Sequence, residues 1–282
     1  MLYRLLLFAL AALALPSALA AQDGGDPPPD PACPRGDPNV PRPQDSVCIG
    51  RLTDDYAFSF VYPRAAVEIP AVDALLREQA TAAETWIAGQ AAAASAERAA
   101  GRGEQARLSY EAGWTADVVT PEIAAFSGTV AHSGGDGGGM EYKAILFDRR
   151  FQRAVRLQDL FAPATFDYSL FGHRLRGVQA MQDAFCRELT RALRARRQNS
   201  DEIVACPAIE AQPVTLVCAH DIGRVVAFMA MLGPDVAGTW SEGPYEIQIP
   251  IDARIMDSLW GRFRPAFGLH QESGAPRRRR GC

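Results

Sequence analysis

The chain has 282 residues, of which 48% are hydrophobic and 22% are charged, and its formal net charge is −4 at pH 7. This composition is typical of a globular protein, and the acidic excess excludes a general nucleic-acid-binding function. Lys143 is the single lysine among 29 basic residues, so the abundance of arginine reflects a compositional bias rather than phosphate recognition.

Residues 1–20 have the three parts of a secretory signal. Arg4 supplies a positive start, residues 5–15 form an apolar run too short to span a bilayer, and residues 18–20 have the small-x-small pattern of a cleavage site. A membrane anchor is the alternative. No later stretch reaches about 18 apolar residues, so we expect a periplasmic or secreted protein that does not span the membrane after signal cleavage.

The cysteines predict disulfide bonds. All six follow the signal, at Cys33, Cys48, Cys186, Cys206, Cys218 and Cys282. An even number in an exported chain favours disulfides. The sequence has no C-x-x-C pair of the kind that a structural zinc site uses, so we predict no zinc site. Residues 21–47 are rich in Pro, Asp and Gly and predict an extended linker, which a disulfide involving Cys33 and Cys48 would attach to the domain.

We predict a disulfide between Cys186 and Cys206. Cys186 lies near the buried side of a predicted helix, and the polar stretch 197–202 lets the chain double back before Cys206. Cys218 is the main rival partner of either residue, and the pairing of Cys282 stays open.

The first predicted elements are a strand and a long helix. In residues 56–62 aromatic residues occupy every second position, which places four rings on one face of a strand. After Pro70, apolar residues recur at helical spacing as far as Ala100, where Gly101 is a natural stop. We interpret Trp86 in this stripe, and Trp114 further on, as core residues.

The remaining elements are mainly strands. Residues 129–131 and 142–147 flank a glycine-rich stretch that predicts a hairpin loop. A second amphipathic helix is predicted over 174–197. Further strands are predicted over 214–218, 225–232 and 245–251, and a short helix follows the last of these. The resulting fold class is α+β, a mainly antiparallel sheet packed with two long amphipathic helices.

Three stretches carry motifs in a fixed order. Residues 56–70 combine a strand, Tyr-Pro, Ile-Pro and a helix start, residues 142–161 form a strand that leads to Leu-Gln-Asp-Leu-Phe, and residues 243–250 read Gly-Pro-Tyr-Glu-Ile-Gln-Ile-Pro. Together they resemble the extracytoplasmic domain of RsiV-type anti-sigma factors, which also occurs as the non-catalytic part of PdaC-type peptidoglycan deacetylases. The family often has Gly-Gly-Ala-His in its hairpin, whereas this chain has His132 before the glycines.

The resemblance covers about residues 48–265, which we predict to form one α+β domain between the linker and a basic tail over 266–282. It implies that the helix 71–100 and the strand 245–251 share one core. In one branch of the family it implies lysozyme sensing, and it does not imply catalysis by this domain.

The sequence contains no recognisable catalytic, metal or cofactor motif. Residues 53–56, Thr-Asp-Asp-Tyr, have only a superficial likeness to a deacetylase motif and predict a solvated turn. No H-E-x-x-H or G-x-S-x-G pattern occurs. The four histidines, His132, His173, His220 and His270, are far apart in the sequence.

The candidate binding residues are therefore Trp240, among turn residues, and His132 and Asp136 at the glycine-rich hairpin. The leading hypothesis is an exported, non-enzymatic protein that binds a cell-envelope partner, either a protein such as lysozyme or a glycan. The alternative is an enzyme that modifies envelope polysaccharides, and a third possibility is a structural envelope component.

Overall fold

The computed structural model describes residues 45–101, 107–133, 138–163, 166–169, 172–197, 205–219, 221–233 and 243–270. Its largest element is a sheet of six strands in the order of the chain, β1 to β6. The strands are β1 (Ser46–Leu52), β2 (Tyr56–Pro63), β3 (Leu108–Val119), β4 (Ile123–Ser133), β5 (Gly139–Asp148) and β6 (Arg153–Val155). Neighbouring strands are antiparallel except for β2 and β3, which are parallel.

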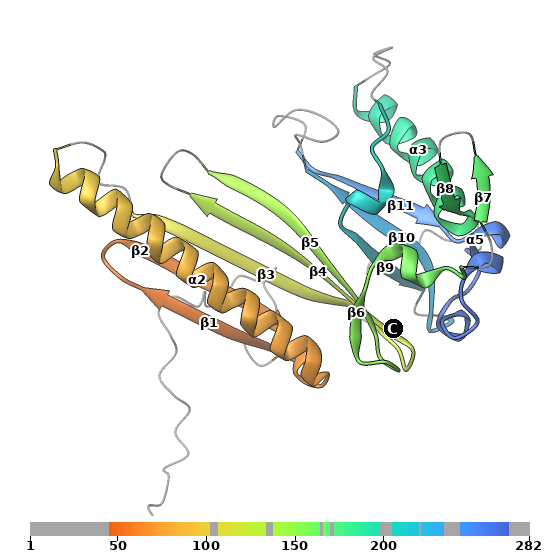
Figure 1. The fold of residues 1–282 in the computed structure, drawn as a ribbon, viewed down its shortest axis with the longest axis horizontal. Helices are drawn as coiled ribbons and strands as arrows, with labels where there is room; N and C mark the ends of the chain where they lie inside the picture. The colour runs from red at the N-terminus through yellow and green to blue at the C-terminus, as the bar shows by residue number, and fades with distance from the viewer. Residues whose placement is uncertain are drawn as a thin grey trace, which may run out of the picture.

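The parallel pair is joined by a helical crossover, as parallel strands require. The short helix α1 (Arg64–Val67) leads into α2 (Pro70–Ala99), which lies along β2 and β3 (Figure 1). Pro70 is accommodated in the first turn of α2. Gly101, at φ +74°, lies in the left-handed region just after the helix, as predicted.

The alternation in β2 explains how α2 docks. The predicted rings of Tyr56, Phe58, Phe60 and Tyr62 are all buried beneath the helix. From α2 the core receives Val72, Leu76, Ala80, Ile87 and Ala91.

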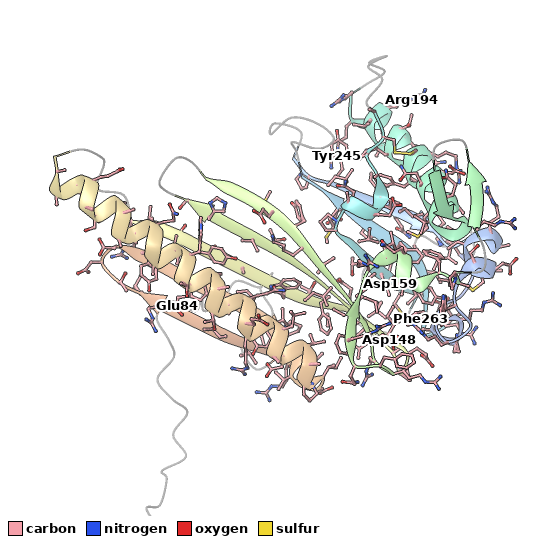
Figure 2. The ribbon with its side chains drawn as sticks, in the orientation of Figure 1. Glu84, Asp148, Asp159, Arg194, Tyr245 and Phe263 are labelled. Carbon is pink, nitrogen blue, oxygen red and sulfur yellow. A yellow bond between two sulfur atoms is a disulfide. The ribbon has the colours of Figure 1, made fainter. Side chains whose placement is uncertain are left out.

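Polar contacts connect α2 to β1, to β2 and to the turn between them at three places along the helix. Arg51 of β1 forms an ion pair with Glu84 at 2.8 Å (Figure 2). The Tyr62 hydroxyl donates a hydrogen bond of 2.7 Å to Asp73, in the first turn of the helix. The predicted turn at 53–55 joins β1 to β2, and its Asp55 forms an ion pair with Arg98 near the helix end.

A second, three-stranded antiparallel sheet has the order β11-β10-β9 and packs with α3 (Arg176–Arg196). Its strands are β9 (Val214–Ala219), β10 (Arg224–Leu232) and β11 (Tyr245–Pro250). The other elements are the hairpin β7 (Phe166–Ser169) and β8 (Gly172–Leu175), α5 (Ala253–Ser258) and the 3-10 turns Leu157–Leu160, Ile209–Ala211 and Arg264–Ala266. The predicted α+β fold with two long helices is thus confirmed.

The two faces of β3, β4 and β5 serve two different hydrophobic clusters. Trp114, Phe126 and Phe147 face α2. Val118 and Leu146 face the opposite way and join the cluster that β9, β10, β11 and α3 build. An irregularity in the β3–β4 pairing between Ala116 and Val118 produces this change of face.

The existence of two clusters corrects one expectation. Helix α2 and strand β11 do not share a core, because Ile247 and Ile249 of β11 belong to the cluster with α3. Their inward alternation in β11 is as predicted, and Pro250 ends that edge strand. Whether residues 48–265 unfold as one unit stays a prediction.

A buried ion pair links the end of β5, in the six-stranded sheet, to the segment that follows α5. The Asp148 side chain at the end of β5 is fully buried, and its Oδ1 accepts hydrogen bonds from the backbone N–H groups of Arg150 and Phe151. Its Oδ2 lies 3.3 Å from Arg262 Nη2. The Arg262 guanidinium also lies over the rings of Trp260 and Phe263, 4.3 and 4.7 Å from their centroids. Asp148 and Phe263 are labelled in Figure 2.

The predicted Cys186–Cys206 disulfide is present and joins α3 to the segment after residue 205. Gln182 supports this connection, because its amide nitrogen donates to the Pro207 carbonyl at 2.9 Å and its oxygen accepts from the Ile209 N–H at 2.8 Å. Segment 205–209 is therefore held by one covalent bond and by hydrogen bonds to a single buried side chain.

The Arg262–Asp148 ion pair leads to a prediction about stability. Arg262→Gln leaves a buried carboxylate without its counter-charge, so the free energy of unfolding should fall by about 3 kcal/mol. The matched control is Arg254→Gln, because Arg254 is exposed and lies 4.0 Å from Asp183; its loss should cost below about 1 kcal/mol. Urea unfolding measures both values, and equal effects of the two substitutions would contradict the prediction.

Tyr62 leads to a prediction about alkaline pH. Burial, with the hydrogen bond to Asp73 as the next cause, raises the pKa of Tyr62 to about 12. The unfolded chain loses the Tyr62 proton at its ordinary pKa of about 10, whereas the folded protein keeps it up to its raised pKa. The stability that the protonated hydroxyl contributes is therefore fully present below about pH 10 and is lost as the pH rises toward the folded-state pKa. The unfolding free energy of the wild type should therefore fall relative to that of Tyr62→Phe between about pH 10 and 12. Parallel urea titrations of both proteins test this, and a constant difference across the window would count against it.

Candidate functional site

A cavity of about 430 Å³ lies beside α2, on the face of the six-stranded sheet that the helix only partly covers. Helix α2 packs over β2 and β3, so the neighbouring surface of β4 and β5, next to their hairpin, stays outside its cover (Figure 1). The cavity is lined by residues from all of these elements. The cavity lies there because α2 contacts β2 and β3 and does not extend over β4 and β5.

The floor of the cavity consists of rings that lie across glycines of the adjacent strand. A β-carbon on Gly128 would lie 2.6 Å from Trp114 Cδ2, and one on Gly139 would lie 2.4 Å from His132 Nε2. Gly128 is the register partner of Trp114, and Gly139 that of His132. The two glycines therefore let an indole and an imidazole rest directly on the backbone.

The wall of the cavity comes from α2. Gln79, Ala82, Ala83 and Trp86 lie at steps of three and four residues and form one stripe of the helix. The two alanines leave space, and Trp86 encloses it. The Trp86 ring meets the His132 ring edge to face, with centroids 5.4 Å apart and an interplanar angle of 74°.

Trp86 is not a core residue, which corrects the interpretation from its position in the apolar stripe. Its exposed fraction is 44%. The neighbouring Ile87 occupies the buried position instead, so Trp86 lies on the flank of α2 and reaches over β3 and β4. There it also meets Tyr110 edge to face at 6.1 Å. The interpretation of Trp114 as a core residue is confirmed, since it is fully buried.

The charged groups at the rim come from β5. Glu141 and Lys143 point to the same face of the strand and form an ion pair of 2.5 Å between two half-exposed side chains. Burial raises the pKa of the Tyr110 hydroxyl, and the nearby Glu141 carboxylate adds to the effect. The rim thus offers a donor and an acceptor whose charges balance each other.

One buried donor borders the cavity. Trp114 lines it, and the Trp114 indole N–H has no hydrogen-bond partner among the described residues. An unpaired buried N–H costs about 1–3 kcal/mol, so this indole lowers the stability of the fold beside the cavity.

Of the three candidate binding residues that the sequence predicted, the structure places His132 in this cavity. Asp136 and Trp240 lie outside the described residues. Among the predicted disulfide cysteines, Cys33 also lies outside them, whereas Cys48 is disulfide-bonded, as is Cys218. The cavity residues that sequence analysis missed are Gln79, Trp86, Tyr110, Glu141 and Lys143. Two features of the sequence could have pointed to these residues. Trp86 lies at the margin of the apolar stripe of the helix, and Glu141 and Lys143 alternate with other residues on one face of a predicted strand.

The arrangement is suited to binding. Its surface is made of ring faces and edges, with an amide, an imidazole and a balanced ion pair at the margin. Within the described ranges, no three His, Cys, Asp or Glu side chains gather as they would around a metal ion. In the same part of the chain, no helix combines the length and apolar character needed to cross a bilayer.

Comparison with known proteins gives structural neighbours only. No family model matches the sequence, and no curated protein does. A DUF3298 family protein from Pseudomonas aeruginosa PAO1 matches with a TM-score of 0.45 and 11% identity, over 77% of this chain and 94% of its own. A member of the DUF3298 family from Bacteroides fragilis matches with a TM-score of 0.43 and 14% identity, over 77% and 92%.

The glycines beneath the rings should respond differently to substitution. In Gly128→Ala the new methyl group would lie 2.6 Å from the ring of a fully buried indole, which must shift to avoid it, so the free energy of unfolding should fall by about 1–3 kcal/mol. In Gly139→Ala the half-buried imidazole can tilt away, so stability should change by less than about 1 kcal/mol while the His132 ring shifts.

The matched control is Gly113→Ala on β3, where a β-carbon would meet nothing within 4 Å. Denaturant unfolding gives the three stabilities, and the His132 imidazole NMR signals report the ring. Similar losses in Gly128→Ala and Gly113→Ala would show that ring contact is not the cause.

Proposed function

We propose that this chain is an exported, non-enzymatic protein of the cell envelope that binds an envelope partner through the cavity between α2 and β3–β5. The observation that carries the proposal is the partly exposed Trp86, which meets His132 and Tyr110 above a floor of rings. Aromatic side chains are enriched in binding sites because they present a large apolar area with little loss of conformational entropy.

The size and composition of the cavity support a binding role. Its volume of about 430 Å³ falls within the usual range of ligand pockets, roughly 300–1,000 Å³. Such pockets combine a mainly apolar lining with a few polar groups that orient the ligand. Gln79, His132 and the Glu141–Lys143 pair are the polar groups here.

Export is supported by the predicted signal and by the cysteines. Cys48, Cys186, Cys206 and Cys218, the cysteines within the described residues, are all disulfide-bonded, and disulfides persist in oxidising compartments outside the cytoplasm. The sequence resemblance to the RsiV-type and PdaC-type exported domain points to the same compartment and to a domain that acts by binding.

The proposal predicts that envelope binding depends on Trp86. Full-length protein produced in a host that processes the signal should appear in the periplasmic or secreted fraction, and it should co-sediment with the washed, insoluble envelope of its own cells. Trp86→Ala should weaken this binding at least tenfold, which is about 1.4 kcal/mol. Trp86 is substantially exposed, so the variant should keep its far-UV circular dichroism spectrum.

The control is Phe151→Ala, which removes another exposed aromatic ring in the turn between β5 and β6, beyond the end of β5 that is remote from the cavity, and should leave binding unchanged. Equal sedimentation of wild type and Trp86→Ala, or retention of the protein in the cytoplasm, would contradict the proposal. Chemical change in the sedimented polysaccharide would favour an envelope-modifying enzyme instead.

A further inference from the structure

We infer that the cavity binds an uncharged sugar residue of an envelope glycan. This inference rests on the proposed binding function and names the chemical class of its ligand. Three properties of the cavity carry it, namely the angle between its rings, the balance of its charges and the position of its hydrogen-bonding groups.

The rings form a corner. The His132 imidazole and the Trp114 indole lie across the glycines of the sheet, and Trp86 stands at 74° to His132 and at 64° to Tyr110. A ligand in this corner meets a ring face on one side and ring edges on the other. A pyranose fits such a corner because one C–H face of its ring can stack on an aromatic face while its equatorial hydroxyls point sideways.

The charges of the cavity favour an uncharged ligand. Glu141 and Lys143 are the acidic and basic residues among its lining, apart from His132, and they neutralise each other. A ligand with a net charge would find no unpaired opposite charge among the described residues that line the cavity. A hydroxyl group both donates and accepts, so it can bond the Glu141 carboxylate and the Lys143 ammonium without separating them.

The remaining polar groups suit the same ligand. Gln79, Tyr110 and His132 add an amide, a hydroxyl and an imidazole to the lining. A sugar hydroxyl both donates and accepts, so it can pair with each of these groups. An apolar peptide side chain would use the rings but would leave these polar groups unsatisfied, at a cost in affinity.

The test uses full-length protein and defined oligosaccharides in isothermal titration calorimetry. The neutral probes are chitotetraose and cellotetraose, and the charged probes are the fully deacetylated, cationic chitosan tetramer and anionic tetragalacturonate. At least one neutral probe should bind, with an affinity at least tenfold higher than that of either charged probe. Trp86→Ala should reduce that affinity at least tenfold, Trp86→Phe should retain part of it, and Phe151→Ala should not change it.

Charge variants sharpen the test. The double substitution Glu141→Gln with Lys143→Gln keeps hydrogen-bonding groups and should still prefer neutral sugars. Lys143→Gln alone leaves an unpaired carboxylate and should raise the affinity for the cationic tetramer relative to the neutral one. The inference is overturned by tighter binding of a charged probe to the wild type, or by neutral binding that Trp86→Ala leaves intact.

The outcomes separate this inference from the proposed function. If envelope sedimentation depends on Trp86 but neither neutral probe binds or competes at millimolar concentration, the binding function stands and the glycan inference fails in favour of a protein partner. If envelope sedimentation itself is independent of Trp86, both fail.

Discussion

Each of the strands β3, β4 and β5 contributes side chains to two different hydrophobic clusters, one on each face of the sheet. Alternate side chains of a strand point to opposite faces, and here one face packs on α2 while the other packs against the sheet β9–β11. The irregular pairing between Ala116 and Val118 lets β3 change face where the second cluster begins. The arrangement of the two halves depends on this double use of the same strands.

The two ends of these strands consequently differ in character. At the end near Leu146 both faces are covered, and Asp148 is buried against Arg262. At the hairpin end α2 covers the sheet only in part, so ring faces and the Glu141–Lys143 pair remain accessible. Burial is concentrated at one end of β5 and the candidate binding surface at the other, so a packed scaffold presents an open site.

The glycines connect the packing to the proposed function. Gly128 and Gly139 contribute no side chain, and for that reason Trp114 and His132 lie close to the sheet and leave space between it and Trp86. A larger residue at either position would lift a ring into that space. The cavity therefore depends on two glycines, Gly128 and Gly139, at strand positions where glycine is otherwise unfavourable.

The sequence by itself determined the local elements, because each depends on a period that nearby residues display. The rings of β2, the helix α2 with its stop at Gly101 and the inward alternation of β11 were all predictable in this way. The Cys186–Cys206 disulfide was predicted from the position of Cys186 on a helix and the short polar return to Cys206, with Cys218 as the rival partner that the structure excluded for this pair. Periodicity assigns residues to a common face, but it does not reveal which element covers that face. Only the tertiary structure decided that β2 and β3 are parallel, that α2 and β11 belong to different clusters, and that Trp86 stands exposed over His132, since these relations join residues far apart in the chain.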